Sequence, residues 1–209
     1  MLFRSDYNGN EEDLLKILSD NGVNYIRIRV WNDPYDSDGN GYGGGNCDID
    51  KAIEIGKRAT QYGMKVLIDF HYSDFWADPD DQVIPKAWAS LSDSEKVQAL
   101  YDYTYESLMK LKKAGVDVGM VAIGNEINLA LAGASYSDDL YYDFLKQGSS
   151  AVRAVYPYKT TGVKVAVHYT NPKKAYGWAE SLVDKKVDYD VFGFSYYPQS
   201  RSEERRVGK

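Results

Sequence analysis

The apolar residues of this 209-residue chain gather in short, nearly continuous runs that are typical of buried β-strands. The runs are YIRIRVW at 25–31, MKVLIDFH at 64–71, VGMVAIGNE at 118–126, VKVAVHY at 163–169 and YDVFGFSYY at 189–197. Polar positions rarely alternate with apolar ones inside these runs. We therefore expect a parallel sheet that is buried on both faces.

Stretches with apolar residues at spacings of three and four separate the strands and predict helices. The expected helices cover 12–18, 48–63, 92–115 and 137–156, with a weaker one at 172–185. Local signals agree with these bounds. The expected N-caps are Asp48, Ser92 and Ser137, the expected capping-box partner is Glu95, and the expected stops are Gly63 and Gly115.

Regular alternation of strand and helix leaves two architectures, a barrel or an open doubly wound sheet. Polar residues stand at the C-terminal end of every strand, where TIM barrels build their active sites, whereas an open sheet binds ligands mainly at one switch point. These residues are Arg29, His71, Asn125, Glu126, His168 and Tyr196. We predict the α/β class and an incomplete (β/α)8 TIM barrel, since a full barrel has eight strands and about 250 residues.

The domain organisation expected is one partial barrel over residues 1–199 and a separate tail over 200–209. The tail, SRSEERRVGK, has four basic and two acidic residues and a single apolar one, which breaks with the composition before it. We interpret it as a segment of doubtful origin.

Charge and composition narrow the function. A net charge of -6 without clustered Lys and Arg argues against nucleic-acid binding. No apolar run reaches the roughly 18 to 20 residues of a membrane span, and no secretory signal follows Met1. Nineteen tyrosines and four tryptophans supply rings with a polar tip, which suit surfaces that bind sugars. Cys47 has no partner for an internal disulfide and is interpreted as a small packing residue.

The strand that ends in Asn125 and Glu126 poses a physical question, because a buried carboxylate needs a partner or a role. Sugar hydrolysis offers one. A carboxylic acid protonates the glycosidic oxygen while a neighbouring amide holds a substrate hydroxyl, and the apolar residues before Gly124 favour the neutral acid.

Two arginines share one face of the first strand, because side chains alternate with a period of two. If Arg27 and Arg29 point into a barrel they need anions, which Asp69 and Glu126 would supply. We predict a site role for Arg29 and leave Arg27 open. His71 lies on the same strand face as Asp69.

The tryptophans divide into two groups. Trp76, in the loop after His71, is placed to stack on a sugar ring, whereas Trp31 and Trp88 are expected to pack in the core.

Metal and nucleotide sites find little support. His71 and His168 lie on separate strands without metal-binding spacing. The DSDGNG stretch at 36–41 imitates the start of a calcium loop, but Cys47 stands where the bidentate Glu belongs. GYGGGN lacks the spacing of phosphate-binding loops. We predict no metal and no cofactor.

Several segments together resemble the arabinogalactan endo-β-1,4-galactanases of glycoside hydrolase family 53. The segments are NGVNYIRIRVWNDP, GNGYGGGN, AIEIGKRATQYGMKVLIDFHYSDFWADP, KAW, AGVDVGMVAIGNEIN and FGFSYYP. The resemblance implies a (β/α)8 barrel that cleaves β-1,4-galactosyl bonds inside galactan or type I arabinogalactan with retention.

Site roles follow from the same resemblance. It implies that Glu126 is the acid/base, that Asn125 holds the sugar 2-hydroxyl, that Arg29 and His71 adjoin the reacting sugar, and that Trp76 lines a glycone subsite. His168 and Tyr196 remain candidates for substrate binding.

The resemblance also sets expectations for the whole protein. The visible strands correspond to the second to sixth of the barrel, so the nucleophile strand and any calcium site of the family would lie outside this chain, which is expected to be inactive alone. An extracellular or cell-surface location and a monomeric complete enzyme are expected. Two alternatives stay open: a related glycanase acting on xylan or cellulose, and a remnant that binds carbohydrate without cleaving it.

Overall fold

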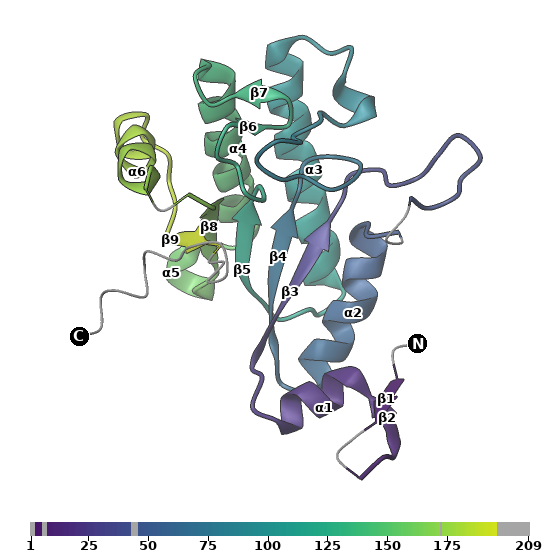
Figure 1. Cartoon of the computed structure of the whole chain (residues 1–209). Helices are drawn as coiled ribbons and strands as arrows, with labels where there is room; N and C mark the ends of the chain where they lie inside the picture. Colours follow the sequence, from purple (N-terminus) through teal and green to yellow (C-terminus); the bar gives the residue numbers. More distant parts are fainter. Residues whose placement is uncertain (1–2, 6–7, 43–45, 172, 196–209) are drawn as a thin grey trace.

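The computed structural model describes residues 3–5, 8–42, 46–171 and 173–195 (Figure 1). At its centre lies a five-stranded sheet in the order β3-β4-β5-β8-β9. Its strands are Tyr25–Val30 (β3), Lys65–Phe70 (β4), Val118–Ile123 (β5), Lys164–Tyr169 (β8) and Val191–Phe194 (β9). All neighbouring strands run parallel, as the unbroken apolar runs predict.

Helices connect consecutive strands. The helices are Leu14–Asp20 (α1), Ile49–Gln61 (α2), Asp93–Lys113 (α3), Asp139–Val155 (α4), Tyr158–Thr161 (α5) and Ala175–Asp184 (α6), with a 3-10 helix at Lys86–Trp88 (η1). Each strand lies beside the next one in the chain, so right-handed crossovers place the connecting helices on one face of the sheet. Figure 1 shows α3 passing behind the central strands, with α2 to the right of β3 and α4 beside α3. This is the arc of a (β/α) barrel, and the predicted fold class is confirmed.

The helix boundaries test the capping signals. The Asp48 side chain accepts the Lys51 N–H at 2.8 Å, and the Glu95 carboxylate accepts the Ser92 N–H at 2.8 Å, which confirms both predictions. Gly63 and Gly115 follow α2 and α3 with φ of 75°, a left-handed stop that glycine adopts without strain.

One predicted cap is wrong. The N-cap of α4 is Asp138, with extended backbone, and the hydroxyl of Ser137 donates to the Asp138 carboxylate at 3.2 Å. Aspartate caps helices as well as serine does, so two adjacent candidates left the first residue of the helix ambiguous in the sequence.

Two short hairpins were not predicted. Phe3–Ser5 (β1) pairs with Glu11–Asp13 (β2), and Ala130–Leu131 (β6) pairs with Ala134–Ser135 (β7), both antiparallel. Strands of two or three residues leave too short a pattern to recognise. Because β2 occupies residues up to 13, α1 begins at Leu14, capped by the Asp13 side chain, and not at residue 12.

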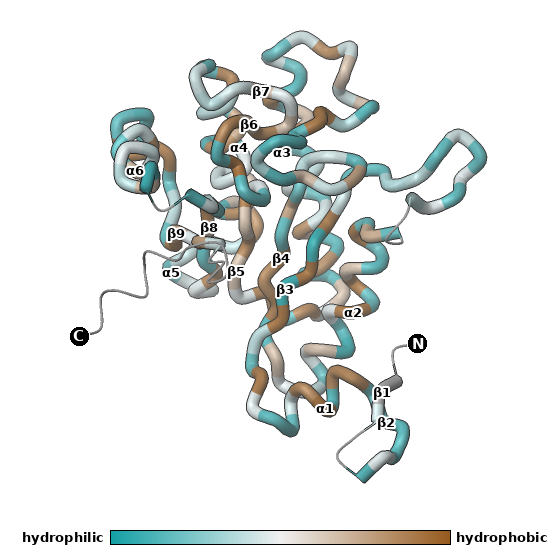
Figure 2. The backbone as a smooth tube through the Cα atoms, viewed as in Figure 1, coloured by the Kyte–Doolittle hydropathy of each residue, from teal (hydrophilic) through white to brown (hydrophobic). Residues whose placement is uncertain are grey.

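The core lies between the sheet and its helices. Val66, Ile68 and Phe70 alternate along β4 and are completely buried in this layer, which Trp88 joins as predicted. Trp31 is also completely buried and has the predicted packing role, but its ring packs against His71, Phe75 and Trp76 at the end of the strands. Figure 2 shows brown, hydrophobic segments along the central strands and more hydrophilic ones in the outer loops. No helix in the described ranges has both the length and the apolar character needed to cross a bilayer.

The opposite face of the sheet carries the strand residues that surround the site. The strand register sets Arg29 beside Asp69, Asp69 beside Ala122, and Ala122 beside Ala166. Small residues on β5 and β8 thus leave room next to the charged residues of β3 and β4.

Candidate active site

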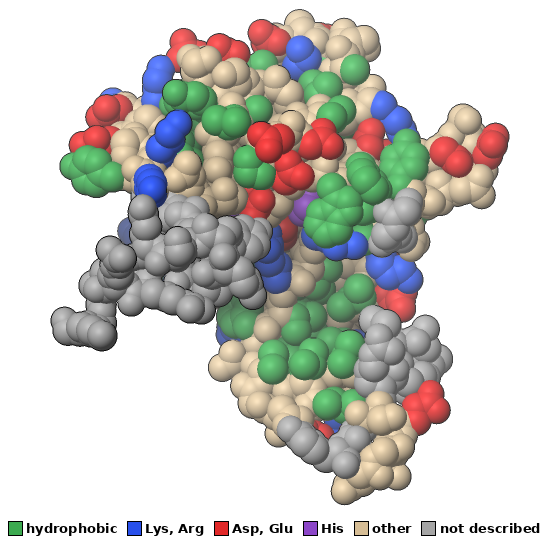
Figure 3. Space-filling model, viewed as in Figure 1, with side chains coloured by type: hydrophobic (Ala, Val, Ile, Leu, Met, Phe, Trp, Pro, Cys, Tyr) green, Lys and Arg blue, Asp and Glu red, His purple; other side chains and the backbone are tan. Residues whose placement is uncertain are grey.

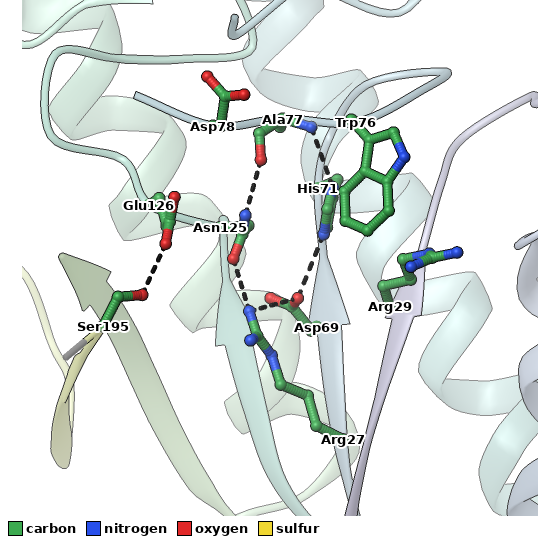
Figure 4. Close-up of a pocket in the computed structure, with 10 residues that line it drawn as sticks. All are labelled: Arg27, Arg29, Asp69, His71, Trp76, Ala77, Asp78, Asn125, Glu126 and Ser195. Atoms are coloured by element: carbon green, nitrogen blue, oxygen red, sulfur yellow. Dashed lines mark hydrogen bonds and ion pairs between the residues drawn. The ribbon is translucent and has the colours of Figure 1, made fainter. Parts of the chain in front are cut away.

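A pocket of about 480 Å³ opens at the C-terminal edge of the sheet. Its lining comes from the ends of β3, β4, β5 and β9 and from the loop after β4 (Figure 4). The lining residues are Arg27, Arg29, Asp69, His71, Trp76, Ala77, Asp78, Asn125, Glu126 and Ser195. Figure 3 shows a histidine on this face between acidic and hydrophobic side chains. The structure therefore brings five predicted site residues together.

Arg27, whose role the sequence left open, lies at the centre of the polar contacts. Its Nη2 atom is 2.7 Å from Asp69 Oδ2 and donates to Asn125 Oδ1 at 2.5 Å. Burial alone would raise the pKa of Asp69, but the hydrogen bond from His71 and the charges of His71 and Arg27 hold that pKa below its usual value. Asp69 thus supplies the anion expected for Arg27.

His71 is held in one tautomer. Its Nδ1 atom accepts the Ala77 N–H at 3.1 Å and the Trp31 indole N–H at 3.3 Å. The proton of the neutral ring therefore lies on Nε2, which faces Asp69 Oδ2 at 3.3 Å. His71 is 1 % exposed, so it orients Asp69 from beneath the pocket surface.

Arg29 lies between aromatic rings. Its guanidinium carbon is 4.1 Å from the centroid of the Trp76 ring and 5.1 Å from that of Trp31, and its Nε donates to Cys47 Sγ at 3.3 Å. Trp76 keeps 43 % of its surface exposed, as a sugar-stacking ring requires. Cys47, predicted to be a simple packing residue, thus also contacts the guanidinium.

The turn after β5 presents Glu126. The strand ends at Ile123, three residues earlier than predicted, because Gly124 has φ of 105° and Glu126 has φ of 50°. A Cβ on Gly124 would lie 2.4 Å from a methyl group of Ile127. A glutamate in the left-handed region costs on the order of 1 kcal/mol, and such strain gathers at functional sites.

Asn125 is locked on both sides. Its side-chain Nδ2 donates to the Ala77 carbonyl at 2.6 Å, and its backbone carbonyl accepts from Gln82 Nε2 at 2.8 Å. The Ala77 bond and the Arg27 contact with Oδ1 fix which way the side-chain amide points.

His168 lies behind Glu126 and outside the set of lining side chains. Its Nε2 atom is 2.8 Å from Ser195 Oγ, which donates to Glu126 Oε1 at 2.6 Å. Its Nδ1 atom accepts the backbone N–H of Glu126 at 3.2 Å. Burial and then the charge of Arg27 lower the pKa of His168. Tyr196, the remaining candidate, lies outside the described residues.

Sequence reasoning did not single out Asp78, Gln82 or Ser195. Ser195 directly precedes Tyr196 at the end of the last strand, so the strand-end rule that found its neighbour also applied to it. Asp78 and Gln82 belong to a long loop, where periodicity gives no signal.

The described part of the chain brings no three His, Cys, Asp or Glu side chains together as ligands for a metal ion. In the stretch that imitates a calcium loop, Asp36 Oδ1 accepts the backbone N–H groups of Asp38 and Asn40 at 2.9 and 2.8 Å. That carboxylate closes a turn of its own backbone.

Comparison with known proteins decides the family. The family model described as "Glycosyl hydrolase family 53" matches residues 2–208. The chain belongs to this family. The predicted resemblance is thereby confirmed.

Individual family 53 relatives agree with the assignment. The chain is 55% identical to the endo-β-1,4-galactanase of Bacillus subtilis over 194 residues, which cover 91% of this chain and 44% of that protein. It is 35% identical to the arabinogalactan endo-β-1,4-galactanase of Cellvibrio japonicus over 202 residues, covering 91% and 51%. The solved Ignisphaera aggregans GH53 catalytic domain superposes with a TM-score of 0.89 at 43% identity, covering 95% of this chain and 56% of that one. The chain spans about half the length of these relatives.

Proposed function

We propose that the protein acts as an endo-β-1,4-galactanase, a retaining glycosidase that cleaves galactosyl bonds inside galactan or type I arabinogalactan. The observation that carries the proposal is the Glu126 carboxyl at the edge of a barrel arc, beside an oriented Asn125 and an exposed Trp76. The names of the relatives, endo-β-1,4-galactanases from two bacteria, support the choice of substrate.

In this proposal Glu126 is the acid/base. It protonates the glycosidic oxygen as the bond breaks and later removes a proton from the attacking water. The backbone turn aims its carboxyl into the pocket, and Ser195 holds one carboxyl oxygen at 2.6 Å.

Asn125 and Trp76 orient the sugar. One N–H of the Asn125 amide goes to Ala77, and in this proposal the second donates to a substrate hydroxyl. The exposed ring of Trp76 stacks on a glycone sugar, while the Arg29 cation on its face fixes the ring. Sugar and catalytic acid are then held in one geometry, which lowers the entropy cost of reaching the transition state.

A retaining glycosidase needs a second carboxylate roughly 5 to 5.5 Å from the first. Asp69 is buried and committed to Arg27 and His71, which makes it a poor nucleophile. We propose that the nucleophile comes from a part of the full-length enzyme that is not among the described residues. The enzyme is further proposed to work as a monomer at the cell surface or outside the cell, where its polymeric substrate lies.

Hydrolysis of a polysaccharide panel tests this proposal. The full-length enzyme should release oligosaccharides from galactan and little from xylan or cellulose, whereas the 209-residue chain should bind galacto-oligosaccharides without cleaving them. Preferential cleavage of xylan or cellulose would contradict the substrate. Rapid turnover of galactan by the 209-residue chain, abolished by Glu126→Gln, would contradict the placement of the nucleophile.

A further inference from the structure

A hydrogen-bond chain joins both ends of Glu126 to one imidazole ring. The Ser195 hydroxyl bridges Glu126 Oε1 and His168 Nε2, at 2.6 and 2.8 Å. On its other side the ring has two neighbours at Nδ1, the Glu126 backbone N–H at 3.2 Å and Asn125 Oδ1 at 2.9 Å. The ring therefore has both a donor and an acceptor beside the same nitrogen.

The protons of this chain are determined when Glu126 is ionised. A carboxylate only accepts, so Ser195 must give its single hydroxyl proton to Glu126. Ser195 can then only accept from His168, which places the ring proton on Nε2. Nδ1 is left as an acceptor, and the Glu126 backbone N–H satisfies it.

The reverse arrangement fits the same atoms when Glu126 is protonated. The carboxyl O–H then donates to Ser195, and Ser195 donates to His168 Nε2. The ring proton moves to Nδ1 and is accepted by Asn125 Oδ1. In total one proton is taken up from solvent, on Glu126, while the ring exchanges an Nε2 proton for an Nδ1 proton and stays neutral.

We propose that Ser195 and His168 are positioning residues for Glu126, and that the tautomer of His168 follows the protonation of that carboxyl. The catalytic role of this coupling rests on the proposed function, because a retaining cycle needs Glu126 first as an acid and then as a base. Each form makes three hydrogen bonds along the chain without movement of heavy atoms: the ionised form uses the Glu126 backbone N–H at Nδ1, and the protonated form gives up that bond for the one to Asn125 Oδ1.

The surrounding charges favour a neutral ring. Arg27 on β3 places Nη2 3.4 Å from Nδ1, and Asp69 and His71 on the β4 side and Asp78 in the following loop face the same pocket. Burial and Arg27 lower the pKa of His168, with a smaller contribution from His71, against the opposing charges of Asp69 and Glu126.

Nitrogen-15 NMR of the histidine rings tests the proposal directly. The chain has only two histidines, and His71 serves as a reference because Trp31 and Ala77 hold it as the Nε2–H tautomer. In a titration over about pH 3 to 8, which brackets the usual range of carboxyl and imidazole groups, His168 should change from Nδ1–H at low pH to Nε2–H at high pH.

Four variants isolate the cause. Glu126→Gln and Ser195→Ala should each abolish the pH-dependent tautomer change, whereas Ser195→Thr, which keeps the hydroxyl, should retain it. Ser73→Ala is the matched control, because Ser73 is a buried serine near the same strand edge that does not line the pocket. It should titrate like the wild type.

Three results would overturn the proposal. His168 could keep a single tautomer at every pH, its tautomer change could survive Ser195→Ala, or the ring could become imidazolium where the tautomer change is expected. Loss of the His71 reference signal would show that Ser195→Ala fails to fold. In that case, comparison of Glu126→Gln with Ser195→Thr still tests whether the tautomer of His168 follows the protonation of Glu126. The readout needs no turnover. A coupled His168 in an enzyme that leaves galactan intact would therefore refute the proposed function alone.

Discussion

The Arg27 guanidinium lies 2.7 Å from the Asp69 carboxylate, and the two partners differ sharply in burial: 46% of the Arg27 side chain is exposed, against 1% for Asp69. Removing the arginine leaves a buried carboxylate whose main remaining partner is the His71 Nε2–H, which is far costlier than loss of a surface pair. We expect Arg27→Ala to lower the free energy of unfolding by about 2 to 3 kcal/mol in urea titrations.

Arg153 offers a control whose carboxylate partners are more exposed, because Asp188 is 63% and Asp190 21% exposed, against 1% for Asp69. Arg153→Ala should cost about 1 kcal/mol or less. Equal losses in the two variants would contradict the buried character of the Asp69 pair.

Acidification should weaken the fold in two separate pH windows. Asp69 has a pKa lowered from 3.8, so its contribution is present above that value and is lost as pH falls through the lower folded pKa. His168 has a pKa lowered from 6.5, so the unfolded state binds its proton first and stability falls as pH drops below 6.5. Urea midpoints measured from pH 8 to 3 should therefore decline in both windows.

Variants with one substitution show which residue causes the loss of stability in each pH window. His168→Gln should flatten the decline below pH 6.5 and leave the acidic one, and Asp69→Asn should do the converse. If the urea midpoint falls with pH in both variants as it does in the wild type, other groups govern the loss of stability in acid.

Gly124 should tolerate no side chain. Its φ of 105° strains any other residue, and an added Cβ would come within 2.4 Å of Ile127, a clash in the turn that carries Glu126. Gly124→Ala should destabilise the protein by about 3 kcal/mol. Gly177→Ala, on α6 with open space around its Cβ, should instead stabilise it by up to about 1 kcal/mol. Thermal melts of the two variants that shift together would contradict this reasoning.

The sequence predicted the strands and the edge where the site lies, because buried strands give a strong apolar pattern and polar residues at their ends stand out. The sequence could not tell which of Arg27 and Arg29 pairs with a carboxylate, because both lie on the same strand face. Only the structure shows that Arg27 pairs with Asp69, whereas Arg29 packs against aromatic rings. The sequence extended the strand to Glu126 because the left-handed turn at Gly124 leaves the apolar pattern unchanged. The contact between His168 and Ser195 joins two strands and has no local signature.

Trp76 should contribute to affinity for the sugar. Trp76→Ala removes an exposed ring and frees Arg29, so we expect roughly tenfold weaker binding of galacto-oligosaccharides by calorimetry. Tyr176→Ala, at an aromatic residue that is 77% exposed on α6 and does not line the active-site pocket, should bind like the wild type. Equal weakening in both variants would place the sugar elsewhere.

The role of Glu126 as acid/base is the central claim, and comparison of two leaving groups in the full-length enzyme tests it most directly. Galactan has a poor leaving group that must be protonated, whereas a dinitrophenyl galactobioside departs without a proton. We predict that Glu126→Gln slows galactan cleavage by about 10² to 10⁴-fold and slows the first-turnover release of dinitrophenol, which precedes the step that needs Glu126 as a base, far less. Equal losses on the two substrates, or galactan cleavage at the wild-type rate, would contradict this role.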